Sequence, residues 1–315
     1  MTSVAVLDDY QNVALTSADW SPVTERAEVV VFTDHLDTAD AVVDALARFD
    51  VLVAMRERTA FPAEVLRRLP ALRLLVTTGM GNAAIDLDAA RALGVTVCGT
   101  GASPAAAPEH TWALLLALVR HVPTEDANVR AGRWQTTVGR ELDGKTIGLL
   151  GLGRIGQRMA RYATAFGMEV LAWSQNLTAE RAAAHGAQLV SKAELFGRSD
   201  VVSIHVKLSD RTRGLVGSEE LRLLGPDGLL VNTSRGPIVD EPALLAALHD
   251  GTVGGAALDV FGVEPLPADD PWRTAPNTVL TGHLGYVTAE QYAVFYGDAV
   301  ADIAAWLDGA PIRTL

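Results

Sequence analysis

The sequence contains a single cysteine, Cys98, among its 315 residues. One thiol can form neither an intramolecular disulfide nor a thiolate metal site, and its apolar surroundings (VTVCG) favour a buried small side chain over a nucleophile. No apolar run approaches the roughly 18 residues that a membrane span needs. Acidic residues also stand near the start of the sequence, where a signal peptide would need a basic segment. We therefore expect a reducing, cytoplasmic location.

A clustered basic surface is also lacking. The 26 lysines and arginines are outnumbered by 38 acidic residues, for a net charge of -12, whereas binding to nucleic-acid phosphates requires a basic patch. With 49% hydrophobic and 20% charged residues the composition is that of an ordinary folded protein. The length suggests two domains of about 150 residues each. We expect no nucleic-acid, membrane or metal partner.

The first hundred residues alternate short apolar strands with amphipathic helices. Strands are predicted at 4–7, 28–32, 51–55, 73–77 and 95–98, and the clearest helices at 38–47, 62–69 and 86–93. This alternation predicts a parallel sheet covered by helices on both faces. The loop at 77–86 (TTGMGNAAID) leaves a strand through two glycines, so the backbone N–H groups of Gly79, Met80 and Gly81 could bind a small anion. A flexible connection is the alternative interpretation.

The small-residue stretch 99–108 (GTGASPAAAP) predicts a crossover between two domains. The apolar helix predicted at 108–120 must be buried, at a domain junction, against a second subunit, or both. His110, in its first turn, is interpreted as structural. A second α/β series follows, with strands predicted at 169–173, 188–190, 200–205, 228–232, 253–260 and 278–281. A last helix over 286–307 is expected to pack back on the first domain.

A glycine motif opens the second series. The segment KTIGLLGLGRIG places Gly151, Gly153 and Gly156 in the spacing G-x-G-x-x-G between an apolar strand and a helix predicted over 158–166. The first glycine permits the turn, the second leaves room for a pyrophosphate, and the third lets helix and strand pack closely. A plain strand-to-helix connection is the alternative, but this context favours dinucleotide binding at the helix N-terminus.

Polar side chains follow three later strands. Arg235 follows GLLV, Asp259 begins a loop that also contains Glu264, and His283 follows a third strand. Because the carboxyl ends of parallel strands meet at one edge, we expect these groups at the edge where the glycine turn would hold a cofactor. A guanidinium can bind a carboxylate bidentately, an imidazole can exchange a proton near neutral pH, and a carboxylate can orient the ring. This set favours hydride transfer to the carbonyl of a 2-oxo acid.

Together these motifs resemble the D-isomer-specific 2-hydroxyacid dehydrogenases. The resemblance runs along nearly the whole chain, through MRERT, TTGMGNAAID, PEHTWALLLA, GKTIGLLGLGRIG, DVVSIHVKL, NTSRGPIVDEPALLAAL, ALDVFGVEPLP and TGHLG. It implies two doubly wound α/β domains, with a Rossmann-type cofactor domain (102–284) inserted in a flavodoxin-like substrate domain (1–101 and 285–315). It also implies an active site in the cleft, a small 2-oxo or 2-hydroxy acid as substrate, and a homodimer.

The resemblance also assigns residues. The family's catalytic arginine, glutamate and histidine fall on Arg235, Glu264 and His283. Asp259 matches the residue that holds the nicotinamide carboxamide. The remaining cofactor-binding positions are Gly151, Gly153, Arg154, Ile155, Gly156, Ser174, Val206, Thr233 and Gly285. The loop Gly79, Met80 and Gly81 matches the one that binds the substrate carboxylate, and Arg56 matches an arginine near the substrate tail.

Three positions depart from the family's pattern. Lys207 and Gly282 each replace a usual proline, and the second change is expected to leave the backbone before His283 less rigid. Ser174 stands where NAD-selective sites have an acid that repels a 2′-phosphate. With serine there that repulsion is gone, and no basic residue that would attract the phosphate follows before Arg181, which is interpreted as too far along the chain. We therefore expect use of both NAD and NADP. A dinucleotide-sensing corepressor or scaffold of the same fold is the alternative function, and formate dehydrogenase is disfavoured because its site typically has glutamine where Glu264 stands.

Overall fold

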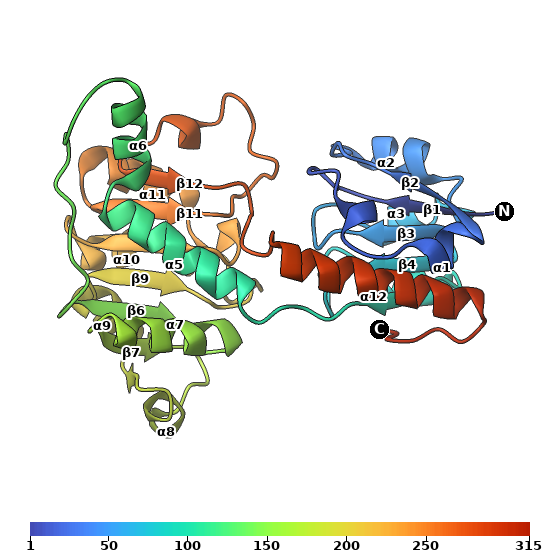
Figure 1. Cartoon of the computed structure of the whole chain (residues 1–315). Coiled ribbons are helices and arrows are strands. Elements are labelled where there is room, and N and C mark those ends of the chain that lie inside the picture. The colour runs from blue at the N-terminus through green and yellow to red at the C-terminus, as the bar shows by residue number, and fades with distance from the viewer. The chain divides into compact units, whose positions relative to one another are not determined.

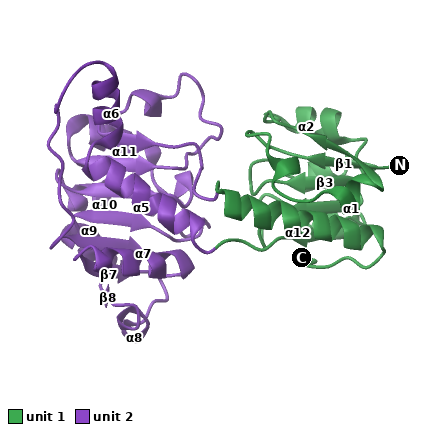
Figure 2. Ribbon diagram, in the orientation of Figure 1, with its two compact units in different colours: residues 1–103, 287–315 green, residues 104–286 purple.

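The protein forms two compact units in the computed structural model, which describes all residues from 1 to 315. Unit 1 comprises residues 1–103 and 287–315, and unit 2 comprises residues 104–286 (Figure 2). The domain boundaries predicted at 101/102 and 284/285 each lie two residues before the limits of these units. Each unit contains one sheet, and every strand pairing is parallel, as the sequence predicts.

Unit 1 has a five-stranded sheet in the order β2-β1-β3-β4-β5 (Figure 1), which is the flavodoxin-like order. The strands are β1 (Thr2–Val6), β2 (Ala27–Val31), β3 (Val51–Ala54), β4 (Leu74–Thr77) and β5 (Thr96–Gly99). The helices are α1 (Ser21–Thr24), α2 (Ala39–Leu46), α3 (Ala63–Leu66), α4 (Leu87–Ala92) and α12 (Ala289–Leu307). The helix predicted at 62–69 is therefore shorter than expected.

Helices cover both faces of this sheet because its central strands β3 (VLVA) and β4 (LLVT) are buried throughout. Helices α2, α3 and α4 contribute Leu46, Leu66 and Ala90 to a core cluster with strand residues of the sheet. Helix α12 packs against β4 and α1, so the prediction that the last helix returns to the first part of the chain is confirmed. It begins at Ala289, where Thr288 accepts a hydrogen bond from the Gln291 amide, and not at 286.

Unit 2 has a seven-stranded sheet in the order β12-β11-β10-β9-β6-β7-β8, which contains the doubly wound order and its switch point between β6 and β9. The strands are β6 (Thr146–Leu150), β7 (Glu169–Trp173), β8 (Gln188–Leu189), β9 (Val201–Ile204), β10 (Leu229–Asn232), β11 (Gly255–Leu258) and β12 (Thr278–Leu280). The helices are α5 (Ala106–Val119), α6 (Val122–Arg130), α7 (Arg154–Ala165), α8 (Ala179–Ala183), α9 (Lys192–Arg198), α10 (Ser218–Leu224) and α11 (Glu241–Asp250).

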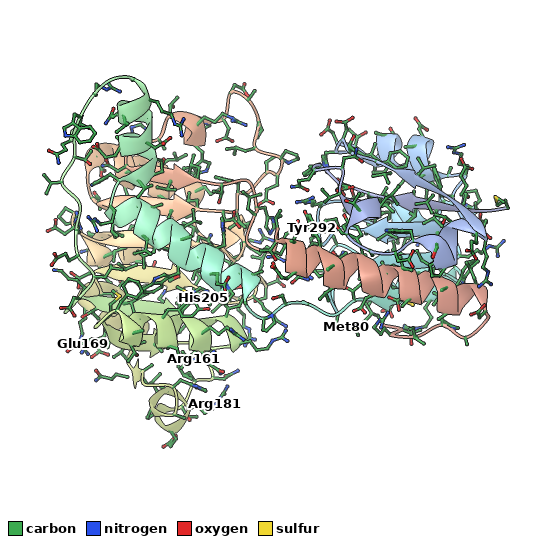
Figure 3. The ribbon with its side chains drawn as sticks, viewed as in Figure 1. Met80, Arg161, Glu169, Arg181, His205 and Tyr292 are labelled. Carbon is green, nitrogen blue, oxygen red and sulfur yellow. The ribbon has the colours of Figure 1, made fainter.

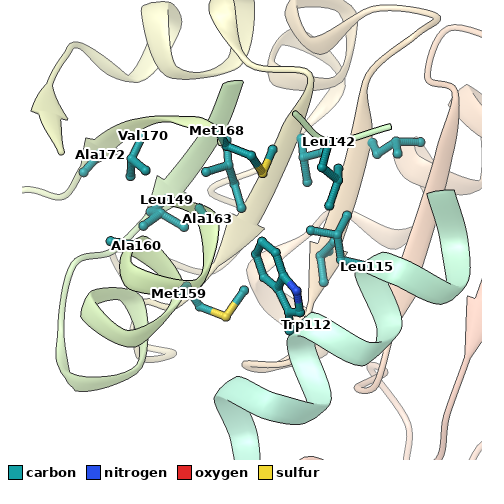
Figure 4. Packing of buried hydrophobic residues seen from close by; sticks show 14 of the residues in the cluster. Trp112, Leu115, Leu142, Leu149, Met159, Ala160, Ala163, Met168, Val170 and Ala172 are labelled. Carbon is teal, nitrogen blue, oxygen red and sulfur yellow. The ribbon is translucent and has the colours of Figure 1, made fainter. Parts of the chain in front are cut away.

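Two apolar clusters sandwich this sheet. Helices α5 and α7 cover one face, and they contribute Trp112 and Met159 to the first cluster, where these two side chains lie beside each other (Figure 4). Helices α9, α10 and α11 form the other. The burial predicted for the apolar helix is thus confirmed, although α5 begins at Ala106 and not at 108. None of the helices combines the length and the hydrophobicity that a membrane span requires.

Candidate active site

The glycine turn joins β6 to α7 as the motif predicts. Gly151 has a φ of +108°, and a Cβ there would lie 2.7 Å from the His205 carbonyl oxygen. A Cβ on Gly156 would lie 2.1 Å from the carbonyl oxygen of Gly151, so helix and turn touch backbone to backbone. Around Gly153, in contrast, a Cβ would meet no atom within 4 Å. The predicted division of roles among the three glycines therefore agrees with the space around each.

Helix α7 begins at Arg154, four residues earlier than predicted. The glycine turn itself forms the first turn of the helix, which hydrophobic periodicity cannot detect because Gly156 has no side chain. Gly153 is the N-cap and makes no side-chain capping bond. The first amides of a helix lack intrahelical partners and carry the positive end of its dipole. An open glycine before an uncapped helix N-terminus is a fitting cradle for a pyrophosphate.

A half-buried histidine lies under this turn. His205 follows β9, its Nε2 is hydrogen-bonded to Ser203 Oγ at 2.9 Å, and burial lowers its pKa to about 3 (Figure 3). The lowered pKa favours the neutral ring, which adds no charge beside the glycine turn. Sequence reasoning assigned no role to this side chain. The signal was a histidine at the end of an otherwise apolar strand.

The end of β7 is where the adenosine ribose is expected. Gly151 N–H donates to the Trp173 carbonyl at 2.8 Å, so the glycine turn and Ser174 are tied together. Arg181 lies on α8 (Figure 3), and its Nη1 donates to the Asn176 carbonyl at 3.4 Å. A turn thus brings this guanidinium back to the loop that follows Ser174. The interpretation of Arg181 as too distant to matter rested on its sequence separation, which the turn shortens.

Two further predicted cofactor positions make contacts inside unit 2. The Thr233 hydroxyl is hydrogen-bonded to the Thr111 hydroxyl of α5 at 2.7 Å. The Val206 carbonyl accepts a hydrogen bond from Ser234 Oγ at 2.6 Å. The first contact connects the segment after β10 to α5, and the second connects the segments that follow the adjacent strands β9 and β10.

The reactive side chains come from three neighbouring strands. Arg235 follows β10, Asp259 follows β11 and His283 follows β12, and these strands are adjacent and parallel. The prediction that they share one edge of the sheet with the glycine turn is therefore confirmed. The arrangement follows from topology, because parallel strands align their carboxyl ends.

His283 and Glu264 form a direct pair. His283 Nδ1 donates to Glu264 Oε2 at 2.5 Å, and the side chains are 17% and 30% exposed. Glu264 Oε1 accepts from the Phe261 amide at 2.8 Å, so both carboxylate oxygens are engaged. With Nδ1 committed to the carboxylate, Nε2 is the nitrogen available to a substrate.

Asp259 fixes the backbone that carries His283. It is fully buried, and its Oδ1 accepts hydrogen bonds from His110, Thr281 and the Leu284 amide, while Oδ2 accepts one from the Gly285 amide. Burial would raise the pKa of Asp259, but hydrogen bonds from His110 and Thr281 hold it below its ordinary value. The structural interpretation of His110 agrees with this contact. Because the carboxylate has no exposed surface in this structure, its predicted contact with a nicotinamide carboxamide stays a prediction.

The His283 backbone is constrained although Gly282 precedes it. His283 has a φ of +55°, which side chains with a Cβ rarely adopt, and its amide donates to the Asp259 carbonyl at 2.8 Å. The Leu284 and Gly285 amides donate to the Asp259 carboxylate, so the amides of three consecutive residues are all hydrogen-bonded to Asp259. The expected loss of rigidity from the missing proline is therefore offset on the C-terminal side of Gly282.

Arg235 is held by the turn that follows β10. Asn232 Nδ2 donates to the Arg235 carbonyl at 3.0 Å, and Asn232 Oδ1 accepts from the Ser234 amide at 3.0 Å. The guanidinium itself donates through Nη1 to the Ser234 carbonyl at 2.6 Å. The side chain is thus positioned by neighbours in its own turn and is half-buried.

The predicted anion loop in unit 1 is ordered by its own contacts. Gly79 has a φ of +88°, and its amide donates to Thr100 Oγ1 at 2.7 Å. This amide is therefore already engaged, and it is the amides of Met80 and Gly81 that have no partner within the chain. Met80 is 57% exposed. Sequence reasoning missed Thr100, which lies more than twenty residues away on the crossover segment after β5.

Arg56 lies over this loop. Its Nη1 donates to the Thr78 carbonyl at 2.9 Å, and a Cβ on Gly79 would lie 2.0 Å from the same nitrogen. Asn82 Nδ2 donates to both the Arg56 carbonyl and Thr77 Oγ1, at 2.5 and 2.9 Å. The loop is therefore a hydrogen-bonded structure that holds a guanidinium over Gly79, the residue before the two free amides, and this disfavours its interpretation as a merely flexible connection.

Comparisons with known proteins agree with the resemblance seen in the sequence motifs. Residues 112–285 match the family model described as the D-isomer specific 2-hydroxyacid dehydrogenase, NAD binding domain. A glyoxylate reductase from Aeropyrum pernix is 39% identical over 256 residues, covering 78% of this chain and 76% of that protein. A crystal structure of a phosphoglycerate oxidoreductase from Vibrio cholerae matches with a TM-score of 0.93 and 36% identity, covering 98% of this chain and 100% of that one.

A D-3-phosphoglycerate dehydrogenase from Mycobacterium bovis is 40% identical over 254 residues, which is 80% of this chain but 48% of that protein. The chain thus spans about half the length of such relatives. The family match supports use of NAD(P) by unit 2. The glycine turn, the paired histidine and glutamate, and the matches over most of the chain agree: the chain belongs to the D-isomer specific 2-hydroxyacid dehydrogenase family.

Proposed function

We propose that this protein is an NAD(P)-dependent oxidoreductase that interconverts a small 2-oxo acid, such as glyoxylate or hydroxypyruvate, and the D-2-hydroxy acid. The observation that carries the proposal is the hydrogen bond of 2.5 Å between His283 and Glu264 at the sheet edge that also presents Arg235 and the glycine turn. A proton donor oriented by a carboxylate is what reduction of a carbonyl to an alcohol needs from the protein.

Each side chain then has a defined task. Bound NAD(P)H supplies the hydride. Arg235 binds the substrate carboxylate bidentately and aligns the carbonyl, while Nε2 of His283 delivers the proton to the carbonyl oxygen. Glu264 holds the ring in place and stabilises its protonated form. The amides of Met80 and Gly81, which lack partners in the chain, are proposed to bind the carboxylate together with Arg235, and Arg56 to contact the substrate tail.

The cofactor is proposed to lie along the glycine turn, with its pyrophosphate at Gly153, Arg154, Ile155 and Gly156. Val206, Thr233, Asp259 and Gly285 are proposed to lie around the nicotinamide. At the ribose, Ser174 offers a hydroxyl and no repelling charge, and the guanidinium of Arg181 lies beside the next loop. We therefore propose that NADPH is accepted at least comparably to NADH.

A homodimer is also proposed, in keeping with the expectation from the sequence. Unit 2 exposes four large apolar side chains in and around α6, and they are Val122, Val129, Trp134 and Val138. Trp134 is 76% and Val138 is 90% exposed, and exposed apolar groups gathered in one segment mark association surfaces. We propose a second copy of the chain as the partner at this surface. We also propose that the protein is located in the cytoplasm. Light scattering of the wild type and of Trp134→Glu tests the dimer: a monomeric wild type contradicts it.

The assay for the function is turnover of a panel of 2-oxo acids with NADH and NADPH, followed at the nicotinamide absorbance. Reduction of at least one of glyoxylate, hydroxypyruvate or pyruvate supports the proposal. Cofactor binding without turnover of any of them would instead favour a dinucleotide-sensing corepressor or scaffold.

A further inference from the structure

We propose that Glu241 is a positioning residue: it holds the loop of residues 259–264, here termed the glutamate loop, and thereby keeps Glu264 against His283. This inference rests on the proposed function, since it assigns Glu241 a task within that site. Glu241 is not one of the catalytic or binding residues predicted from the sequence.

Glu241 is placed to contact a distant backbone and not its own helix. It is the first residue of α11, whose N-terminus is capped by Asp240 through the Ala243 amide. The Glu241 Oε1 instead accepts a hydrogen bond from the Gly262 amide at 2.7 Å, across 21 residues of chain. A carboxylate bound to a backbone N–H makes a charge-assisted bond, roughly twice as strong as a neutral one.

The approach of the two groups leaves no room for a side chain at position 262 unless the Glu241 carboxylate moves away. A Cβ on Gly262 would lie 2.6 Å from Oε2 of Glu241, inside any normal contact distance. On the other side, a Cβ on Gly236 would lie 2.2 Å from the carbonyl carbon of Phe261. The glutamate loop is therefore held between the Glu241 carboxylate and the backbone that directly follows Arg235.

The held peptides are the ones that orient Glu264. The Phe261 amide donates to Glu264 Oε1 at 2.8 Å, and Gly262 is the next residue. Glu264 Oε2 in turn accepts from His283 at 2.5 Å. A continuous set of hydrogen bonds thus leads from Glu241 through the amides of Gly262 and Phe261 to Glu264 and the imidazole of His283. Loss of the bond from Gly262 to Glu241 would free the glutamate loop, which positions Glu264.

The charges around Glu241 show why a hydrogen bond is needed there. Burial raises the pKa of Glu241, hydrogen bonds from the Gly262 amide and the Trp272 side chain oppose this, and the carboxylates of Asp270 and Glu264 raise it further. Arg213 and Asp240 line the same hollow of about 300 Å³. The carboxylates of Asp270 and Glu264 both repel the charge on Glu241, so the hydrogen bond to Gly262 forms against that repulsion. Glutamine at position 241 would keep the acceptor and remove the charge.

The experiment compares Glu241→Ala, Glu241→Gln and Gly262→Ala with the wild type and with Glu219→Ala. Glu219 is a matched control, because it is an exposed acid in the first turn of α10. Gly262→Ala attacks the same contact from the other side, since its methyl group would displace the carboxylate. The measurements are kcat and KM across pH on a substrate that the wild type reduces, cofactor affinity from fluorescence, and Tm.

We expect Glu241→Ala and Gly262→Ala to lower kcat by about 10- to 100-fold, because catalytic groups displaced by an ångström lose rate on that scale. The loss should fall on kcat in both, while cofactor affinity stays unchanged. Glu241→Gln should keep most of the activity. Wild-type kcat in both alanine variants would overturn the inference, as would equal losses in Glu241→Ala and Glu241→Gln. Absence of wild-type turnover would count against the proposed function instead.

Discussion

The Glu264–His283 pair allows a quantitative prediction. Glu264→Gln replaces the carboxylate that His283 Nδ1 contacts at 2.5 Å with a neutral amide of the same size. Two unit charges about 4 Å apart attract each other by about 4 kcal/mol at an effective dielectric constant of about 20, and by about 1 kcal/mol in water. Because the two side chains are 17% and 30% exposed, solvent screens the pair, and we take about 1 to 2 kcal/mol.

That energy is available to hold the ring and to favour the imidazole that donates the proton, and about 1.4 kcal/mol corresponds to a tenfold change in rate. In Glu264→Gln, kcat/KM in the reductive direction should therefore fall by about 10-fold or more, because the ring also loses its orientation. The assay is NAD(P)H oxidation by a reducible 2-oxo acid, with Glu219→Gln as control. An unchanged kcat/KM in Glu264→Gln would refute the role of this carboxylate.

Three other predictions follow from single side chains. Arg235→Lys should lower both kcat and affinity for the 2-oxo acid, because lysine lacks the planar fork that aligns a carboxylate; steady-state kinetics check this, and a loss of affinity alone would mean binding without orientation. Ser174→Asp should shift the ratio of kcat/KM for NADPH over NADH toward NADH by about 10-fold or more, as expected for a repelled 2′-phosphate; wild-type rejection of NADPH or an unmoved ratio would contradict it. Burial raises the pKa of Asp302 from 3.8 to about 7, with Arg313 opposing, so stability due to its protonated form is present below about pH 4 and lost as the pH rises toward 7. Asp302→Asn should therefore raise Tm relative to wild type more at pH 8 than at pH 5, and an equal change at both would refute this.

Features that depend on strand topology could be predicted from the sequence. The parallel sheets follow from apolar runs such as VLVA and LLVT, which are buried on both faces. Once β10, β11 and β12 are parallel neighbours, residues just beyond their carboxyl ends must meet, so Arg235 and His283 could be placed on one edge without coordinates. The glycine spacing likewise predicted the turn between β6 and α7. The backbone contact at Gly156 leaves no space for a side chain, so only glycine can occupy that position.

Contacts between side chains and distant backbone could not be predicted in the same way. The bonds from the Gly79 amide to Thr100 and from the Gly262 amide to Glu241 join residues about twenty positions apart. They depend on rotamers and loop paths that no periodicity records. Arg181 shows the same limit, because the loop before α8 turns its guanidinium back toward the end of β7. Such contacts decide which backbone amides and charges are available to a ligand.

The most direct test of the account is His283→Ala, assayed with its cofactor affinity measured in parallel. The account predicts that kcat falls by about 10²- to 10⁴-fold, as for loss of a general acid, while NAD(P)H binds with nearly wild-type affinity because the glycine turn and Gly153 are untouched. Turnover close to that of the wild type in His283→Ala would contradict the central claim that this histidine supplies the proton.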